Sequence, residues 1–335
     1  MFGVQVPGTG QVYFVSVMGS YGEFQALAFY KGFEGLVAFL KFRAETERLS
    51  HMGLSDESTI PASLLGGATM TIPHLMLSFA NREHLEKADL AAIKKSGVRF
   101  RGKGQWPRIE EIVPGYMPVY PDREILVELY LVMEQTMHVL EQVEEAIETG
   151  ELEQAVEYLR PEDDPDQTLL IRIPTGKGPR FRWKDLYLIT DPLWGEQSYE
   201  VNISSESRMK LSGLPVASQV LQLDLFMLPA PVREKGSRDY FPFVMLMLDK
   251  QDELITSTSV LSPQPDLQFM YESVPQQVVN ELIQLGHKPS KIEIRSDLLF
   301  ELLEEILEEA GCPVQWVNQM AQMDEAIGSF ISHLT

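Results

Sequence analysis

Two aspartates stand where a metal ion could be bound. Asp249 ends the apolar run FPFVMLMLD and opens the polar turn KQDE, and Asp297 follows the strand-like run KIEIRS. If the two strand ends were adjacent, the carboxylates could hold Mg²⁺ or Mn²⁺ through their oxygens and support phosphodiester hydrolysis. Each acid also has a structural interpretation, because Asp249 suits a hairpin turn and Asp297 suits a helix N-cap. The turn is the interpretation we favour for Asp249.

The elements that would position these acids follow an α/β pattern. From about Tyr240 the apolar runs and helix punctuation predict a hairpin, a helix over 275–285 and a strand at KIEIRS. A helix over 297–310, a strand at PVQWVN and a final helix from Met323 complete the chain. This order of elements resembles the ribonuclease H-like fold.

That resemblance implies a specific set of acids. In the ribonuclease H-like family, one aspartate lies on the first strand and a second at the end of the strand that follows the first helix. A further acid lies on a later helix. The matching positions here are Asp249, Asp297 and either Asp324 or Glu325. The resemblance therefore implies a divalent-metal-dependent nuclease or phosphotransfer enzyme.

The N-terminal half repeats part of this order. A hairpin is predicted from Gln11, followed by the unit PHLMLSFANREHLEKADLAAIKKSGVRFRG. That unit and PSKIEIRSDLLFELLEEILEEAGCPVQWVN each form a strand, turn on Asn81 or Asp297, form a helix, stop at a glycine and begin another strand. In the first unit this last strand covers 98–101. We expect an internal duplication of two similar α/β modules with mixed sheets and packed helices, although strand-helix-strand units also recur without duplication.

The acidic, proline-containing stretch RPEDDPDQ is typical of a linker. We therefore predict an N-terminal module over 1–162, a β-rich connector over 163–238 and a ribonuclease H-like module over 239–335. The whole chain also resembles an uncharacterised group of bacterial two-module proteins, through VYFVSVMGSYGEFQALAFYKGFEGL and RDYFPFVMLMLD. No activity comes with that second resemblance.

Composition limits the partners and the compartment. The chain has 335 residues and a formal charge of −21, which opposes broad contact with a phosphate backbone, so we expect no nucleic-acid partner. The single cysteine, Cys312, fits a reducing compartment. No run approaches the length of a membrane span or of a secretory core, so we expect a cytoplasmic protein without a membrane contact.

Two short stretches gather basic and aromatic residues in this acidic chain. The first, PTGKGPRFRWK, could contact an anion or nucleic acid, or it could be an exposed hairpin that pairs with acidic surface. Its four cations are Lys177, Arg180, Arg182 and Lys184. It lacks the spacing of a phosphate-binding loop. The second stretch, VRFRGKGQWPR, has the same two interpretations.

The motifs favour binding over catalysis. We find no nucleophile elbow, dinucleotide fingerprint or histidine pair at metal-ligand spacing. The helix after Asp297 carries five glutamates and no basic residue, which is typical of a solvated face and unusual beside a nuclease site. We therefore expect a non-enzymatic binding or interaction protein with a protein partner and no cofactor. The alternative is the nuclease that uses Mg²⁺ or Mn²⁺, and the oligomeric state stays open.

Overall fold

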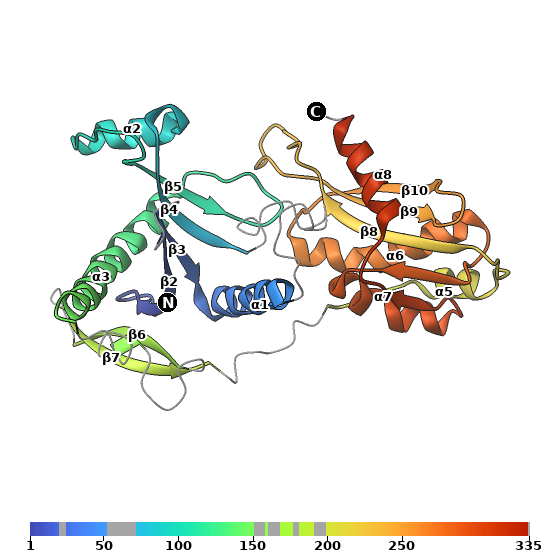
Figure 1. The fold of residues 1–335 in the computed structure, drawn as a ribbon, viewed down its shortest axis with the longest axis horizontal. Coiled ribbons are helices and arrows are strands. Elements are labelled where there is room, and N and C mark those ends of the chain that lie inside the picture. Colours follow the sequence, from blue (N-terminus) through green and yellow to red (C-terminus); the bar gives the residue numbers. More distant parts are fainter. Residues whose placement is uncertain are drawn as a thin grey trace. The chain divides into compact units, whose positions relative to one another are not determined.

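The computed structural model describes residues 1–19, 25–51, 72–150, 158–159, 168–176, 181–190 and 199–333. These residues form two compact units (Figure 1). The first unit is built from the N-terminal part of the chain up to the strand that ends at Ile189. The second unit contains 199–333 together with the short segment Pro114–Met117.

The first unit is built on a seven-stranded sheet with the order β5-β4-β3-β2-β1-β6-β7. Neighbouring strands are antiparallel except β1 and β6, which are parallel. The strands are β1 (Phe2–Gln5), β2 (Val12–Met18), β3 (Ala26–Lys31), β4 (His74–Ala80), β5 (Trp106–Ile112), β6 (Thr168–Thr175) and β7 (Arg182–Ile189).

Helices cover both faces of this sheet. Because side chains alternate along a strand, Tyr13 and Val15 of β2 face α3 (Arg123–Glu148), whereas Phe14 faces α1 (Gly32–His51). Leu129 of α3 packs in the first of these cores. A third helix, α2 (Lys87–Ser96), lies in the connection between β4 and β5 and follows a short 3₁₀ turn.

The second unit is built on a five-stranded sheet with the order β10-β9-β8-β11-β12. Strands β8, β9 and β10 form an antiparallel meander, and β11 and β12 run parallel to β8. The strands are β8 (Val220–Met227), β9 (Phe243–Asp249), β10 (Ile255–Leu261), β11 (Lys291–Ile294) and β12 (Val314–Trp316). The helices are α5 (Ser205–Ser212), α6 (Leu267–Leu285), α7 (Asp297–Glu309) and α8 (Ala321–Ser332).

Strand β8 separates the two faces of the second sheet. Leu221, Leu223 and Leu225 point into the core formed with α5, α6 and α7. Phe226 packs on the opposite face against α8. Period-two alternation places the polar residues Gln222 and Asp224 on this second face as well. These two polar groups of β8 are therefore directed towards the side that α8 covers.

The prediction of a mixed α/β protein with two modules is confirmed. Both sheets contain the same four-strand arrangement: β3-β2-β1-β6 in the first matches β10-β9-β8-β11 in the second. The matched strand-helix-strand units differ in structure, however, because β4 and β5 are antiparallel whereas β11 and β12 are parallel. Residues 98–101 form no strand. The loop after α2 turns at Gly102 and Gly104, both at positive φ, and returns the chain alongside β4 in the reverse direction.

The predicted connector over 163–238 contributes strands to both sheets. Strand β6 pairs with β1 and β7 pairs with β6, so these two strands complete the first sheet. Strand β8 is the central strand of the second sheet. Because β8 pairs with strands that lie far along the chain, its own sequence indicates a strand but does not identify its partners. The meander of the second unit therefore begins at β8, one strand earlier than predicted.

Gly115 lies in the segment Pro114–Met117, which belongs to the second unit although it comes from the first half of the sequence. A substitution of Gly115 tests how this segment packs. Its φ is +80°, its carbonyl accepts from the Phe241 N–H at 2.8 Å, and a Cβ there would lie 2.8 Å from Pro263 Cβ. We expect Gly115→Ala to lower the free energy of unfolding by about 3 kcal/mol, through backbone strain and overpacking. Gly104→Ala is the matched control, because its φ is +65° and nothing lies within 4 Å of its Cβ position. Gly104→Ala should lower the free energy of unfolding by about 1 kcal/mol. Calorimetry measures both variants, and equal losses of unfolding free energy would contradict the packing of Gly115 against Pro263.

Candidate functional site

Asp249 shapes the turn between β9 and β10. Its side chain is 5% exposed, and Oδ1 accepts from the backbone N–H groups of Gln251 at 2.8 Å and Asp252 at 3.1 Å. Oδ2 accepts from the side-chain amide of Gln219. Burial acts to raise the pKa of this carboxyl, but the three hydrogen bonds outweigh it and hold the pKa below its usual value. The turn backbone thus binds one oxygen of the carboxylate, and Gln219 binds the other.

Asp249 and Asp297 do not meet. Strand β8 lies between β9 and β11, which separates the two strands by about 10 Å across the sheet. The register pairs Asp249 with Leu221, and Leu221 with Ile292 at the start of β11. Asp297 follows the far end of β11 and is the first residue of α7. The two acids therefore lie at opposite ends of the sheet, which corrects the hypothesis of a shared metal site.

The N-cap of α7 is also one residue away from its expected position. Ser296 is the capping residue, and its Oγ accepts from the Leu299 N–H at 3.3 Å. Asp297 lies in the first turn, where a negative charge interacts favourably with the helix dipole.

The carboxylates that do converge belong to Asp224 and Asp324. Asp224 lies on β8 and is completely buried, and Asp324 lies in the first turn of α8. Arg295, which follows β11 and has a side chain 6% exposed, lies between them. Its Nε donates to Asp224 Oδ2 at 2.9 Å, and its Nη1 donates to Asp324 Oδ1 at 2.5 Å. We call these three residues the arginine clamp.

The three charged groups of the arginine clamp affect one another's pKa. Burial raises the pKa of the Asp224 carboxyl, because the ionised form loses its hydration. The Arg295 guanidinium opposes that effect by donating from both Nε and Nη2 to Asp224. The carboxylates of Asp224 and Asp324 together raise the pKa of Arg295 against the opposing effect of burial. A metal ion could reach both carboxylates only if the guanidinium moved away.

A second ionic cluster surrounds Glu293 of β11. Its carboxylate is nearly inaccessible and accepts from Lys250 Nζ at 2.8 Å, Lys291 Nζ at 3.0 Å and Gln222 Nε2 at 3.3 Å. Burial alone would raise the pKa of Glu293, but the hydrogen bonds from these three side chains lower it below its usual value. Gln222 Oε1 is buried and has no hydrogen-bond partner in the described part of the chain. The cluster joins β8, β11 and the β9–β10 turn.

Glu325 lies apart from the arginine clamp. It lines a pocket of about 580 Å³ between α8 and the adjoining ends of β9 and β10. Leu248, Ile255, Phe330 and His333 line the same pocket. Of the two later-helix acids that the sequence left open, Asp324 is the one that binds Arg295, which in turn binds the buried Asp224.

The predicted basic hairpin is described only in part. Lys177 and Arg180 lie outside the described residues. Arg182 and Lys184 are exposed at alternate positions of the edge strand β7, whereas Trp183 between them packs against the core beneath α3. The two described cations therefore face solvent.

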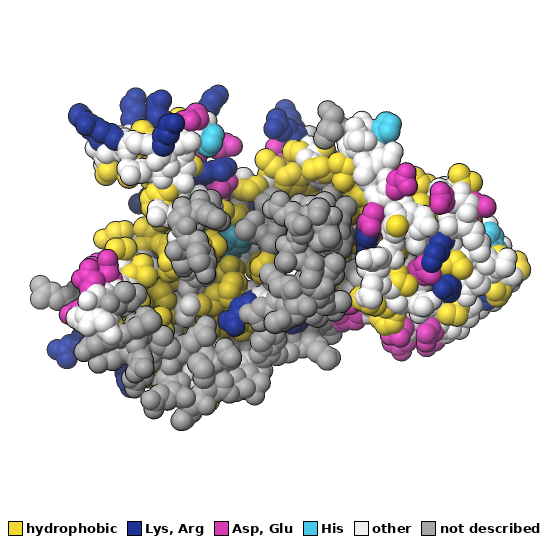
Figure 2. Space-filling model, viewed as in Figure 1, with side chains coloured by type: hydrophobic (Ala, Val, Ile, Leu, Met, Phe, Trp, Pro, Cys, Tyr) yellow, Lys and Arg dark blue, Asp and Glu magenta, His cyan; other side chains and the backbone are white. Residues whose placement is uncertain are grey.

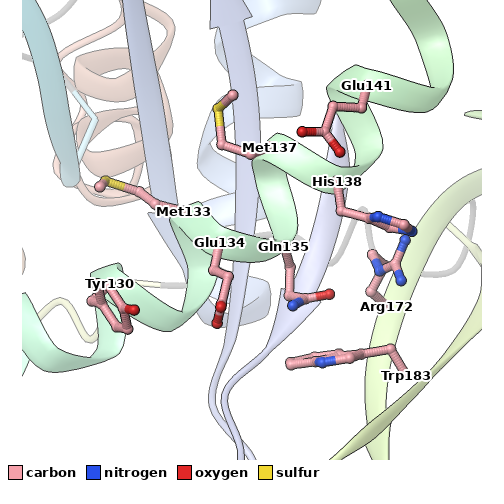
Figure 3. Close-up of a pocket in the computed structure, with 9 residues that line it drawn as sticks. All are labelled: Tyr130, Met133, Glu134, Gln135, Met137, His138, Glu141, Arg172 and Trp183. Carbon is pink, nitrogen blue, oxygen red and sulfur yellow. The ribbon is translucent and has the colours of Figure 1, made fainter. Parts of the chain in front are cut away.

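A groove of about 620 Å³ in the first unit lies between α3 and strands β6 and β7. Gln135 and Arg172 are buried in its wall, and Arg172 is held by Asp185 at 3.5 Å and by the Tyr158 hydroxyl at 3.3 Å. Figure 3 shows Gln135 extending from α3 towards the side where Arg172 and Trp183 lie. Amide, guanidinium and indole groups can bind a planar polar ligand, but they include no nucleophile paired with a base.

The arginine clamp had a sequence signal that was missed. In VLQLDLFM, polar residues occupy alternate positions of an otherwise apolar strand, which indicates that one face meets a polar partner.

In the described residues no group of three or more His, Cys, Asp or Glu side chains could hold a metal ion. Among the helices that the structure describes, none is long and apolar enough to cross a membrane.

Two family models match the chain. Residues 1–160 match a domain of unknown function, DUF7309, and residues 207–331 match another, DUF6930. No curated protein matches the chain. The second match begins before β8, as the second unit does, and it includes the whole arginine clamp. The two matches confirm the expected resemblance to two-module proteins whose domains have no assigned function.

The arginine clamp predicts an asymmetric response to loss of an arginine. Arg295→Met leaves Asp224 as a buried charge without a cation, so we expect unfolding free energy to fall by about 3–5 kcal/mol. Arg208→Met is the matched control, because Arg208 and Glu309 form an exposed pair at 3.1 Å. The control should lose less than about 1 kcal/mol by chemical denaturation. Similar losses in both variants would show that Asp224 does not depend on Arg295.

The Glu293 cluster predicts a pH dependence of stability. A carboxyl whose pKa is lower when folded stabilises the protein above its unfolded pKa, and that contribution is lost as pH falls through the folded pKa. The difference in Tm between the native protein and Glu293→Gln should therefore be largest at neutral pH and shrink as the pH falls below 4.5. Glu305→Gln, on the exposed face of α7, is the control and should show a small difference at every pH. A pH-independent Glu293→Gln difference would rule out an ionic role for this carboxylate.

Proposed function

We propose that this is a non-enzymatic binding protein of the bacterial cytoplasm. The observation that carries the proposal is Arg295, whose guanidinium lies where the buried carboxylate of Asp224 and the helix carboxylate of Asp324 converge. A two-metal nuclease needs its acidic oxygens free to bind cations about 4 Å apart. Here Arg295 already binds one oxygen of each carboxylate, Oδ2 of Asp224 and Oδ1 of Asp324.

The order of strands in the second unit supports this proposal. With β8 as its first strand, the unit resembles the ribonuclease H-like fold: an antiparallel meander followed by two strands parallel to the first. In that comparison Asp224 takes the place of the first-strand acid and Asp324 that of the later-helix acid. The strand after the first helix is followed directly by Arg295, and Asp297 comes two residues later as the first residue of α7. The unit thus combines a strand order that resembles the ribonuclease H-like fold with an arginine, Arg295, between Asp224 and Asp324.

The remaining surface supports binding without catalysis. The groove between α3 and β7 offers polar and aromatic groups, including the indole of Trp183. Cys312 is buried, and burial raises the pKa of its thiol to about 12, which disfavours a thiolate nucleophile. The charge of −21 disfavours broad nucleic-acid contact and favours a protein partner.

A metal titration tests the proposal against the nuclease alternative. We expect Mg²⁺ and Mn²⁺ to leave the Tm of the native protein unchanged, because Arg295 already neutralises the acids they would bind. Asp224→Asn is the matched variant and should respond to metal no differently from the native protein. The nuclease alternative would replace our proposal if Mn²⁺ raised Tm in the native protein and not in Asp224→Asn, with metal-dependent cleavage of a nucleic acid.

A further inference from the structure

The connection between β4 and β5 carries a cluster of exposed cations on an acidic protein. We call this cluster the basic surface and define it by its residues. They are Lys87, Lys94, Lys95, Arg99, Arg101 and Lys103. We propose that the basic surface binds an acidic segment of a partner protein. This deepens the proposed binding function, on which it rests, by naming the chemistry of the partner.

The charges of the basic surface are available to a partner. All six side chains are exposed, and the described part of the chain records no ion pair for any of them. Figure 2 shows dark blue side chains gathered around the region of α2. Residues 81–108 contain eight basic and three acidic residues, a charge of +5, so the rest of the chain carries −26. This concentration of positive charge is a local exception in the molecule.

Two of the three acids of the same connection, Glu86 and Asp89, are used to begin α2, and the third, Glu83, is exposed. Asp89 is buried and accepts from the Glu86 N–H at 3.0 Å, while the Glu86 side chain accepts from the Asp89 N–H. This capping box uses both carboxylates to begin α2. Lys94 and Lys95 also stabilise the end of α2 through the helix dipole. The three cations of the following loop have no such helical role.

The loop that presents those three cations is anchored. Gly97 ends α2 in the left-handed region, and the Gly104 N–H donates to Asn81 Oδ1 at 2.8 Å. The ring of Phe100 lies 6.2 Å from that of Trp106, and the Arg82 guanidinium lies 5.6 Å from the centre of the same indole. These contacts hold Arg99 and Arg101, on either side of Phe100, before any partner arrives. A preformed loop loses less conformational entropy on binding.

The size and surroundings of the basic surface favour an acidic protein segment over a nucleic acid. The ten residues of α2 span only about 15 Å, so a nucleic acid strand would extend beyond them towards a molecule whose remaining charge is −26. A short acidic segment can end where the cations end. Val98, which is 54% exposed beside Arg99, offers an apolar contact of the kind that acidic segments with leucine or phenylalanine use.

Fluorescence anisotropy with the full chain tests this inference. The probe is a labelled peptide of about 12 residues that alternates Asp and Glu with Leu and Phe, and the comparison probe is a single-stranded DNA of equal charge. The test variant is Arg99→Gln/Arg101→Gln/Lys103→Gln. The matched control, Arg123→Gln/Lys210→Gln/Lys235→Gln, removes the same charge from exposed cations elsewhere in the described residues. Circular dichroism melting of each variant verifies folding.

We expect the peptide to bind the native protein more tightly than the DNA does, and to bind more weakly at higher salt. The test variant should lose about tenfold in peptide affinity, and the control should stay within about twofold. Absence of peptide binding, tighter binding of the DNA, or equal losses in both variants would each overturn the inference. Because the metal titration does not depend on these cations, failure here would leave the proposed non-enzymatic function standing.

Discussion

A carboxylate buried at the centre of a sheet needs a cation, and this requirement organises the second unit. Asp224 is completely buried on β8, and removing such a charge from water without a partner costs several kcal/mol. Arg295 supplies the partner from the end of β11 and reaches on to Asp324 of α8. One side chain therefore joins the central strand, its parallel neighbour and the covering helix.

This requirement also explains why an enzyme-like arrangement of strands is compatible with a binding function. Acids directed to one point repel each other unless a cation lies between them. A metal ion can be that cation, and then the site can perform chemistry. An arginine can be that cation too, and then the charge is permanent and the oxygens are occupied. The second unit has the arginine, and the binding function that we propose would use the surfaces of the two units.

Local features could be predicted from the sequence, whereas pairings could not. The apolar run before Asp249 and the polar residues after it predicted a strand and a turn, and the side chain of Asp249 does accept from the turn's backbone. The strand character of 220–227 was also visible, but its central place in the sheet depends on Leu221 pairing with Asp249 and Ile292. Such contacts join residues far apart in the chain, and a strand's composition does not identify its neighbours.

The residues of the candidate site could also be seen in the sequence, whereas their contacts could not be predicted from it. The polar residues at alternate positions of β8 were present in the sequence, and so was the arginine after KIEI. Only the parallel register of β8 and β11 brings them together, and a shift by one strand in the assumed order moved the expected first-strand acid from Asp224 to Asp249. The basic surface was visible as a cluster of cations, yet its predicted strand over 98–101 is instead a loop, which leaves those cations exposed.

The central claim is that Arg295 occupies the place where a metal ion would have to bind. Crystals grown with Mn²⁺ test it most directly, because anomalous scattering locates manganese independently of the protein atoms. The account predicts no manganese peak at Asp224 or Asp324, with the Arg295 guanidinium bound to both carboxylates. A manganese ion coordinated by Asp224 and Asp324, with Arg295 displaced, would contradict it.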